Sequence, residues 1–315
     1  MINVCILEPY SLSALARLKA DPRVALTDDL KQAQVALVRS RIKVDKDFLA
    51  QAPQLKLVVS ATSGFDHMDW QLAAKRDIIT AHCPEANGAA TAELTLSLML
   101  ALERDLVRAT KNVRGNLWRE GLQRPQGLAG RTLGVVGLGR VGKRVARLAQ
   151  ALDMHVIGHD PYVDLNALNI ENYGFIELLR ASDLVTLHVP LTKPTLHLMN
   201  QPTLNEMQSE AILINTCRGP VVDENDLLVA LDEGTIAGAA MDVIEREPPP
   251  KGHRLLTHPK LLLTPHIGAF TQNAWDRSSQ EAVEKVLRFL DGQPVGNALP
   301  LAEPWFAACH TPSGT

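Results

Sequence analysis

Short runs of β-branched and aliphatic residues alternate along the chain with longer segments whose apolar residues recur at helical spacing. This alternation is typical of βα units that build a parallel sheet. The runs form two series, the first at 3–7, 35–39, 55–60 and 78–80, the second at 132–137, 155–160, 184–189, 211–216, 237–243 and 261–265. We therefore expect two α/β domains, the second with six strands.

Two longer segments predict helices that connect these series. Residues 91–113 are apolar almost all round over their first three turns, which indicates a helix buried on both sides, between the domains. Residues 273–292 form an amphipathic pattern closed by Gly292, and this helix could return the chain to the first domain. The tail 303–315 is expected to be a loosely held terminus.

Composition and charge narrow the possible functions. The chain has 315 residues, more than one domain usually holds, and its 46% hydrophobic and 21% charged residues are ordinary for globular proteins. Because 32 Lys and Arg face 35 Asp and Glu, no cationic surplus is present to bind nucleic acid or an anionic membrane. No run of apolar residues reaches bilayer length and no basic leader opens the chain, so a soluble cytoplasmic protein is expected.

The cysteines predict neither disulfides nor a metal site. Cys5, Cys83, Cys217 and Cys309 stand far apart, without a C-x-x-C pair and without histidines at metal-ligand spacing. That pattern is typical of unpaired thiols in a reduced compartment. We therefore expect no structural zinc.

A glycine-rich turn provides the first chemical signal. Gly137, Gly139 and Gly142 form G-x-G-x-x-G directly after the strand-like run 132–136, at the opening of an amphipathic helix. The first glycine permits a tight turn, the second lets the backbone approach a pyrophosphate, and the third allows close packing of helix on strand. The helix N-terminus then favours the anion. This arrangement predicts a dinucleotide site, the alternative being an ordinary glycine turn.

Asp160 decides which dinucleotide is expected. It ends the next strand-like run, where a carboxylate accepts hydrogen bonds from the ribose hydroxyls and repels a 2′-phosphate. Pro161 and Tyr162 follow it, so the simplest phosphate-binding arginine is absent. The sequence therefore favours NAD over NADP.

Three polar residues follow the ends of the later strand-like runs. Arg218 comes after 211–216, Glu247 a few residues after 237–243, and His266 directly after 261–265. Ligands of open α/β sheets gather at the carboxyl ends of the strands. Hydride transfer from a 2-hydroxy acid, or to a 2-keto acid, needs a planar cation for the carboxylate and a proton-exchanging group, which a second carboxylate can orient. Taken singly, the arginine could serve a surface ion pair and the histidine a loop hydrogen bond.

Asp242 and Cys217 each have two possible roles. Asp242 could hold the nicotinamide carboxamide or could cap the segment that follows it. Cys217 adjoins Arg218 without a base nearby in sequence. It is interpreted as a backbone contributor, with a thiol nucleophile as the alternative.

Several motifs in order carry a family resemblance. They are GLAGRTLGVVGLGRVGKRVA (127–146), HVPLTKPT (188–195), INTCRGPVVDENDLLVAL (214–231), GAAMDVIEREPP (238–249) and TPHIGA (264–269). With them the chain resembles the D-isomer-specific 2-hydroxyacid dehydrogenases, which are NAD-dependent. The resemblance implies an α/β fold of two Rossmann-like domains with parallel sheets and a cleft between them.

The resemblance also implies site residues and an oligomer. The family's catalytic residues fall on Arg218, Glu247 and His266, and its cofactor contacts fall on Gly137, Gly139, Arg140, Val141, Gly142, Asp160, Val189, Thr216, Cys217, Asp242, His266, Gly268 and Ala269. It places a substrate domain at 1–97 and 287–315 and an NAD-binding domain at 98–286. Active forms are usually homodimers.

The segments at 38–58 and 63–69 point to the substrate. They resemble the D-3-phosphoglycerate dehydrogenase branch in its short form, with Ser63, before Gly64, at a position near nicotinamide and substrate. Arg39 and Lys43 could donate to a substrate phosphate.

Two departures from that branch leave other functions open. Ser60 stands where that branch commonly has Arg, and His67 where it commonly has Asn. A smaller substrate such as hydroxypyruvate or glyoxylate is therefore an alternative. In that case Arg39 would only form an ion pair with an acidic side chain at the surface. A different class of function is a non-catalytic NAD-sensing regulator on the same fold.

Overall fold

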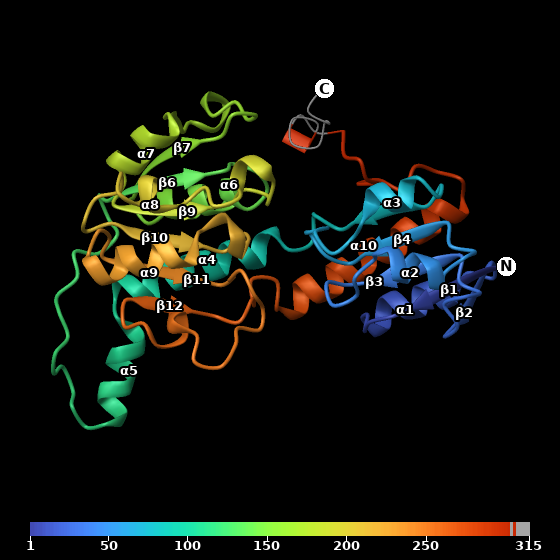
Figure 1. The fold of residues 1–315 in the computed structure, drawn as a ribbon, viewed down its shortest axis with the longest axis horizontal. Helices are drawn as coiled ribbons and strands as arrows, with labels where there is room; N and C mark the ends of the chain where they lie inside the picture. Colours follow the sequence, from blue (N-terminus) through green and yellow to red (C-terminus); the bar gives the residue numbers. More distant parts are fainter. Residues whose placement is uncertain (303–304, 307–315) are drawn as a thin grey trace. The chain divides into compact units, whose positions relative to one another are not determined.

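The computed structural model describes residues 1–302, 305 and 306, and its chain forms two compact units. Unit 1 comprises Met1–Gly88 and Ala269–Thr315, and unit 2 comprises Ala89–Gly268. Both are α/β layers around a parallel sheet, which confirms the expected fold class. Figure 1 labels their helices and strands.

The boundaries of the units correct the expected ones near residues 97 and 287. Helix α4 (Gly88–Glu103) packs Leu96 and Met99 into the core of unit 2. Helix α10 (Gln272–Leu290) packs Ala282 and Val286 into the core of unit 1. Each helix joins its unit over its whole length, so the boundaries lie beside the helix starts, at 88/89 and 268/269.

Unit 1 is built on a five-stranded sheet of order β2-β1-β3-β4-β5, in which every pairing is parallel. Its strands are β1 Ile2–Ile6, β2 Val24–Thr27, β3 Val35–Val38, β4 Leu57–Ser60 and β5 Ile79–His82, and its other helices are α1 Leu12–Lys19, α2 Lys46–Gln51 and α3 Trp70–Ala74. The sequence pattern missed β2. This edge strand is short and only half-buried, so it lacks a continuous apolar run.

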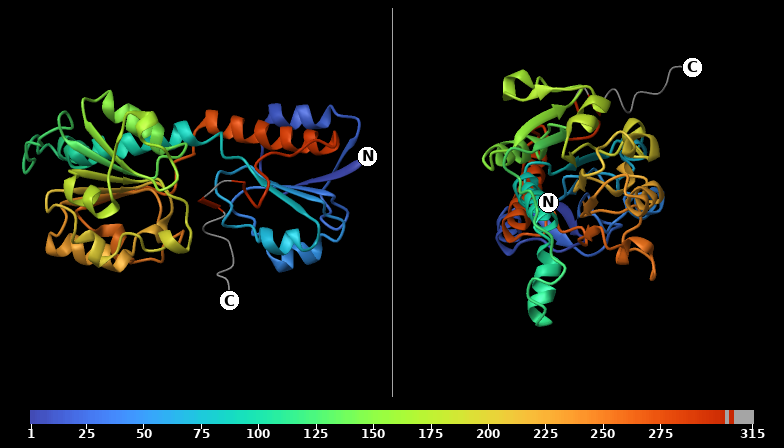
Figure 2. Two further views of the ribbon diagram at one scale, coloured as in Figure 1. Left: turned by 90° about the horizontal axis from the view of Figure 1, so that it is seen from above. Right: turned by 90° about the vertical axis from the view of Figure 1, so that its left-hand side faces the viewer.

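Alternate residues of these strands fill two cores. On β3, Val35 and Leu37 belong to the core cluster that includes residues of α1 and α10, whereas Ala36 and Val38 belong to the cluster that includes residues of α2. Each face of the sheet is therefore covered, as parallel sheets require. Figure 2 (left) shows α1 and α10 on one side of this sheet and α2 and α3 on the other.

Unit 2 is built on a seven-stranded parallel sheet of order β12-β11-β10-β9-β6-β7-β8. Its strands are β6 Thr132–Val136, β7 His155–His159, β8 Glu171–Asn172, β9 Leu184–Leu187, β10 Ile212–Asn215, β11 Gly238–Met241 and β12 Leu261–Leu263. Its other helices are α5 Leu106–Arg114, α6 Gly142–Gln150, α7 Phe175–Ala181, α8 Gln201–Leu204 and α9 Glu224–Glu233, with 3-10 turns η1 Asn166–Leu168, η2 Lys193–Thr195, η3 Gly219–Val221 and η4 Arg254–Thr257. The six predicted strands are confirmed, and the two-residue β8 is added at the edge.

Both faces of this second sheet are covered too. On β10, Ile212 and Ile214 pack in the cluster that includes residues of α4 and α6, and Leu213 packs in the cluster that includes residues of α7, α8 and α9. Since all strands run in one direction, their carboxyl ends share one edge. The chemistry of unit 2 is therefore expected along that edge.

Two predicted segments differ in detail. The helix expected over 91–113 is broken at Asp105, whose φ of 45° ends α4 and starts α5. The tail is not wholly loose, because Phe306 is buried against Phe65 and Trp70, with ring centroids 5.8 and 5.3 Å away. The other tail residues, 303–304 and 307–315, lie outside the described residues.

The described residues also bear on cysteine, metal and membrane chemistry. Cys5, Cys83 and Cys217 are free thiols, while Cys309 lies outside the described part. Within the described ranges, acidic, histidine and cysteine side chains form no cluster able to hold a metal ion. Among the helices of residues 1–302, none has both the length and the hydropathy needed to cross a bilayer.

Candidate active site

The glycine turn after β6 requires glycine at two of its three positions. Gly137 has φ +88°, and a Cβ there would lie 2.7 Å from the carbonyl oxygen of His188. A Cβ on Gly142 would lie 2.0 Å from the carbonyl oxygen of Gly137, so α6 packs directly on the turn. A Cβ on Gly139 would meet no atom within 4 Å, so this glycine leaves open space beside the backbone. Such space is what the approach of a pyrophosphate needs.

The start of α6 is open to an anion. Its N-cap, Val141, supplies no side-chain hydrogen bond, and the N–H groups of Lys143 and Arg144 donate to the carbonyl oxygens of Gly139 (3.2 Å) and Val141 (2.9 Å). The dipole at this helix N-terminus favours an anion. Asp160 follows β7, and its carboxylate accepts hydrogen bonds from the N–H groups of Leu138 (2.8 Å) and Tyr162 (2.9 Å). Each oxygen keeps a second lone pair for a ribose hydroxyl. These residues fit a dinucleotide.

The turn after β12 is built around Asp242, which is almost fully buried. Its carboxylate accepts hydrogen bonds from the Thr264 hydroxyl (2.6 Å) and from the N–H groups of Ile267 (2.9 Å) and Gly268 (2.7 Å). The Asp242 carbonyl oxygen accepts from the His266 N–H at 2.8 Å. These contacts hold the turn after β12, not the segment that directly follows Asp242, and the expected contact of Asp242 with the nicotinamide carboxamide stays a prediction.

His266 and Glu247 form a pair at the same edge of the sheet. His266 Nδ1 lies 2.6 Å from Glu247 Oε2, and Glu247 Oε1 accepts from the Ile244 N–H at 3.1 Å. Because Nδ1 donates to the carboxylate, Nε2 is left for a substrate. Burial alone would raise the pKa of Glu247, but the hydrogen bond and charge of His266, with the charge of Arg218 nearby, lower it on balance.

Arg218 is presented by a turn after β10 that Asn215 holds. The Asn215 side chain donates to the Arg218 carbonyl oxygen (2.9 Å) and accepts from the Cys217 N–H (3.0 Å). The Arg218 guanidinium also donates to the Cys217 carbonyl oxygen at 2.6 Å. Burial raises the pKa of the Cys217 thiol to about 11, which keeps it protonated and argues against a nucleophilic thiol.

The other expected cofactor residues lie along the same edge. Val189 follows β9, and its side chain would lie 3.0 Å from a Cβ on Gly137. Thr216 is buried, with its hydroxyl 2.8 Å from that of Thr95 on α4. Arg140 is exposed in the glycine turn, and Ala269 directly follows unit 2.

With this geometry in place, a comparison with family models is decisive. Residues 96–268, more than half of the chain, match the model described as D-isomer specific 2-hydroxyacid dehydrogenase, NAD binding domain. The chain belongs to the D-isomer specific 2-hydroxyacid dehydrogenases. The matched region ends at the boundary of unit 2, so the NAD-binding domain of this family is the unit that contains the glycine turn.

Relatives in this dehydrogenase family carry different names. A D-3-phosphoglycerate dehydrogenase of Methanocaldococcus jannaschii is 38% identical over 278 residues, covering 87% of this chain and 53% of the relative. The chain thus spans about half of that protein. A glyoxylate reductase of Thermofilum pendens is 38% identical over 280 residues, covering 86% of this chain and 82% of the relative. The substrate is therefore not settled by similarity.

Solved structures of the family share both Rossmann-like domains. The D-lactate dehydrogenase of Aquifex aeolicus, complexed with NAD and lactic acid, superimposes with a TM-score of 0.84 at 28% identity, covering 94% of this chain and 98% of that one. The two-domain dehydrogenase fold and the assignment of NAD as cofactor are thereby confirmed.

The expected substrate residues all lie in unit 1. The Ser63 carbonyl oxygen accepts from His82 Nδ1 (2.8 Å), and the Gly64 carbonyl oxygen accepts from the Thr62 hydroxyl (2.8 Å). Lys43 is exposed. The Arg39 guanidinium donates from Nη2 to the Ser278 hydroxyl of the same unit at 2.9 Å.

Sequence reasoning missed the residues that hold the site. Asn215 ends β10 inside an apolar run, and a buried amide at a strand end is the signal that could have identified it. Thr264 gave no signal, since a threonine at a strand end is common.

Proposed function

We propose that this protein is an NAD-dependent dehydrogenase of D-2-hydroxy acids. The observation that carries the proposal is the His266–Glu247 pair at the carboxyl edge of the sheet that also carries the glycine turn. Bound NAD supplies the acceptor of the hydride from C2 of the acid. His266 Nε2 takes the hydroxyl proton as the carbonyl forms, and Glu247 stabilises the resulting imidazolium.

Arg218 is the proposed binding group for the acid. Its planar guanidinium matches a carboxylate in two parallel hydrogen bonds, and its charge also polarises the carbonyl oxygen. In the reverse direction, the same cation favours attack on a 2-keto acid, and His266 returns the proton.

The proposed acid is 3-phosphoglycerate, and Arg39 provides the structural support. Its guanidinium lies 4.2 Å from the centroid of the Trp275 ring and 5.6 Å from that of Tyr10, and it donates to the Ser278 hydroxyl at 2.9 Å. One of its terminal nitrogens, Nη1, is buried without a hydrogen-bond partner among the described residues. A buried guanidinium N–H without an acceptor favours an anionic oxygen there.

A reductase of hydroxypyruvate or glyoxylate is the second candidate. The uncharged Ser60 at the end of β4 favours it, because its hydroxyl hydrogen-bonds His67 (2.9 Å) and Thr62 (2.6 Å). Ser60 therefore offers no charge to a phosphate. A purely NAD-sensing regulator would bind NADH but reduce no 2-keto acid.

A panel of keto acids with NADH tests these candidates. With phosphohydroxypyruvate we expect a kcat/KM at least about tenfold above those with hydroxypyruvate and glyoxylate. Arg39→Gln should lower kcat/KM roughly 10 to 100-fold for phosphohydroxypyruvate only, since a charged hydrogen bond to its phosphate is lost. Arg17→Gln, an exposed α1 variant of the same type, is the control. Equal rates for glyoxylate and the phosphorylated acid would favour the second candidate.

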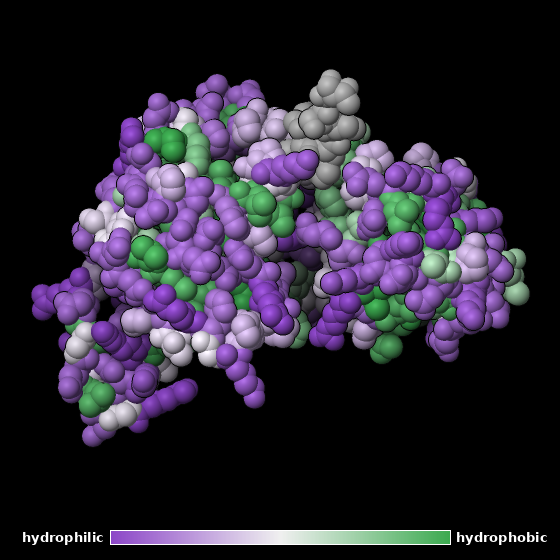
Figure 3. Space-filling view, in the orientation of Figure 1, coloured by the Kyte–Doolittle hydropathy of each residue, from purple (hydrophilic) through white to green (hydrophobic). Residues whose placement is uncertain are grey.

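We further propose that the protein is a homodimer that uses helix α5. Figure 3 shows apolar side chains among polar ones on the arm that contains α5, at the lower left. Val107 and Trp118 are 61% and 67% exposed, and Leu106, Val113 and Leu117 are exposed beside them. Apolar residues gathered on a surface in this way are typical of protein interfaces. Helix α4, which is also rich in apolar residues, packs several of them into the core of unit 2 and offers less exposed apolar surface.

Light scattering after gel filtration tests the dimer. The unaltered protein should elute with twice the chain mass, and Val107→Asp should shift it toward the monomer because a desolvated charge opposes association. Leu12→Asp, at a leucine of α1 that is even more exposed than Val107, should leave the dimer intact. A monomeric unaltered protein would contradict the proposal.

A further inference from the structure

The loop that carries Glu247 depends on the peptide between Ile244 and Glu245. The Ile244 N–H donates to Glu247 Oε1 at 3.1 Å, and the Glu245 N–H donates to Glu224 Oε1 at 2.6 Å. The Ile244 N–H belongs to the preceding Val243–Ile244 peptide, which shares Ile244 with the Ile244–Glu245 peptide. A displacement of the Ile244–Glu245 peptide would therefore move Ile244, and with it the Glu247 carboxylate, away from His266. Whatever anchors the peptide therefore sets the geometry of the pair.

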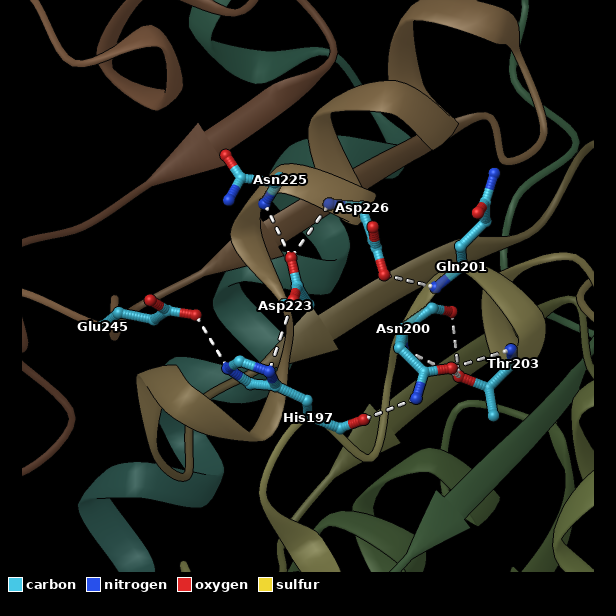
Figure 4. A network of polar contacts seen from close by, with 8 residues as sticks. All are labelled: His197, Asn200, Gln201, Thr203, Asp223, Asn225, Asp226 and Glu245. Carbon is cyan, nitrogen blue, oxygen red and sulfur yellow. Dashed lines mark hydrogen bonds and ion pairs between the residues drawn. The ribbon is translucent and has the colours of Figure 1, made fainter.

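His197 is positioned to supply that anchor, as Figure 4 shows. Its Nε2 lies 3.0 Å from Glu245 Oε1, and its Nδ1 lies 3.3 Å from Asp223 Oδ2. Only an imidazole with N–H groups on both nitrogens can donate to both carboxylates. Asp223 is itself fixed, because it caps α9 by accepting from the N–H groups of Asn225 and Asp226.

The backbone of His197 is fixed on both sides. Its φ is +50°, in the left-handed region that side chains other than glycine rarely adopt. Its N–H donates to the Pro220 carbonyl oxygen at 2.8 Å, and its carbonyl oxygen accepts from Asn200 Nδ2 at 2.9 Å. Asn200 in turn caps α8. The imidazole is therefore presented to Glu245 from a rigid turn.

The turn that follows Arg218 rests on the same peptide from another side. A Cβ on Gly219 would lie 2.0 Å from the carbonyl carbon and oxygen of Ile244 and 2.5 Å from the Glu245 nitrogen. The two backbones are thus in direct contact. The peptide couples the loop of Glu247 to the turn of Arg218.

The surroundings of the peptide are rich in carboxylates. Burial raises the pKa of Glu224, and the neighbouring charge of Glu245 raises it further. His253 Nε2 lies 3.6 Å from Glu224 Oε2 and faces it from the other side. Without the ring of His197, Asp223 and Glu245 would lose a shared donor, and only His253 would offset the repulsion between Glu245 and Glu224.

We propose that His197 is a positioning residue of the active site, which together with Asp223 and Glu245 forms a carboxylate–imidazole–carboxylate brace. The brace holds the Ile244–Glu245 peptide and thereby keeps the Glu247 carboxylate on His266 Nδ1. This inference rests on the proposed role of His266 as acid and base.

His197→Asn tests the brace with the keto acid of the panel that is reduced fastest. Asparagine tolerates positive φ but cannot reach both carboxylates, so the fold should be kept. We expect kcat to fall roughly 3 to 10-fold with KM and NADH affinity nearly unchanged, and the pH limb of kcat/KM that reports His266 to move to lower pH. Glu245→Gln should lower kcat and move the pH limb in the same way. The variant with both substitutions should lose little more activity than either single variant.

His155→Asn is the matched control, since His155 is an exposed histidine 3.6 Å from Glu171 at the opposite edge of the same sheet. It should leave kcat and the pH profile unchanged. The titration of His266 in NMR spectra of histidine-labelled protein, assigned with His266→Gln, gives a readout without turnover. If no keto acid is reduced, the proposed function fails, whereas the brace is still tested by NMR. The brace is overturned if His266 titrates at the same pH in His197→Asn as in His155→Asn.

Discussion

Replacement of His266 by glutamine is expected to lower kcat by roughly 10² to 10⁴-fold while NADH binding stays within about twofold. Glutamine can still donate a hydrogen bond to Glu247, but it cannot take up the substrate proton. The bound keto acid would then depend on water for its proton. Stopped-flow reduction with NADH, together with NADH fluorescence titration, measures the two effects separately.

The stability of His266→Gln is measured as a control, to show that the variant is folded. His266 has φ +53°, a conformation that histidine adopts more readily than glutamine, so thermal unfolding should reveal a small decrease in Tm. His266→Asn, which tolerates this conformation better, should lose as much activity with a smaller loss of stability. A variant that turns over at the rate of the unaltered protein would refute the acid–base role.

Alanine at Gly142 should destabilise the protein, whereas alanine at Gly139 should leave its stability unchanged. At Gly142 the new Cβ would lie 2.0 Å from the Gly137 carbonyl oxygen, so α6 must move away from the turn. Overpacking of this kind costs about 1 to 3 kcal/mol, and we expect Tm to fall and NADH binding to be almost lost. At Gly139 the Cβ meets no atom within 4 Å, so Tm should stay unchanged while NADH affinity falls roughly tenfold or more.

Gly142→Ala and Gly139→Ala are informative together because each variant is the control for the other. Differential scanning fluorimetry gives Tm, and fluorescence titration gives the Kd of NADH. Unchanged NADH affinity in Gly139→Ala, with normal Tm, would show that the pyrophosphate does not approach this turn.

Much of the fold could be predicted from the sequence, because buried parallel strands are continuous apolar runs. Six of the strands of unit 2, the edge strand β12 among them, were found in this way. The edge strands β2 and β8 were missed because they are short or half-exposed, and the break at Asp105 was missed because a single left-handed residue leaves the apolar pattern intact.

The candidate site was predictable only in part. Arg218, Glu247 and His266 follow strand ends, and the structure brings His266 and Glu247 into contact. The brace of His197 was not predictable, because its members lie in turns far apart along the chain and no periodicity relates them. The cleft between the domains and a cytoplasmic location stay predictions.

A crystal structure with NAD and oxamate, an unreactive analogue of a 2-keto acid, tests the central claim most directly. The account predicts the oxamate carboxylate paired with the Arg218 guanidinium, its carbonyl oxygen within hydrogen-bond distance of His266 Nε2, and its C2 about 3 to 3.5 Å from C4 of nicotinamide. Oxamate bound away from both side chains, or His266 Nε2 directed away from the ligand, would contradict it.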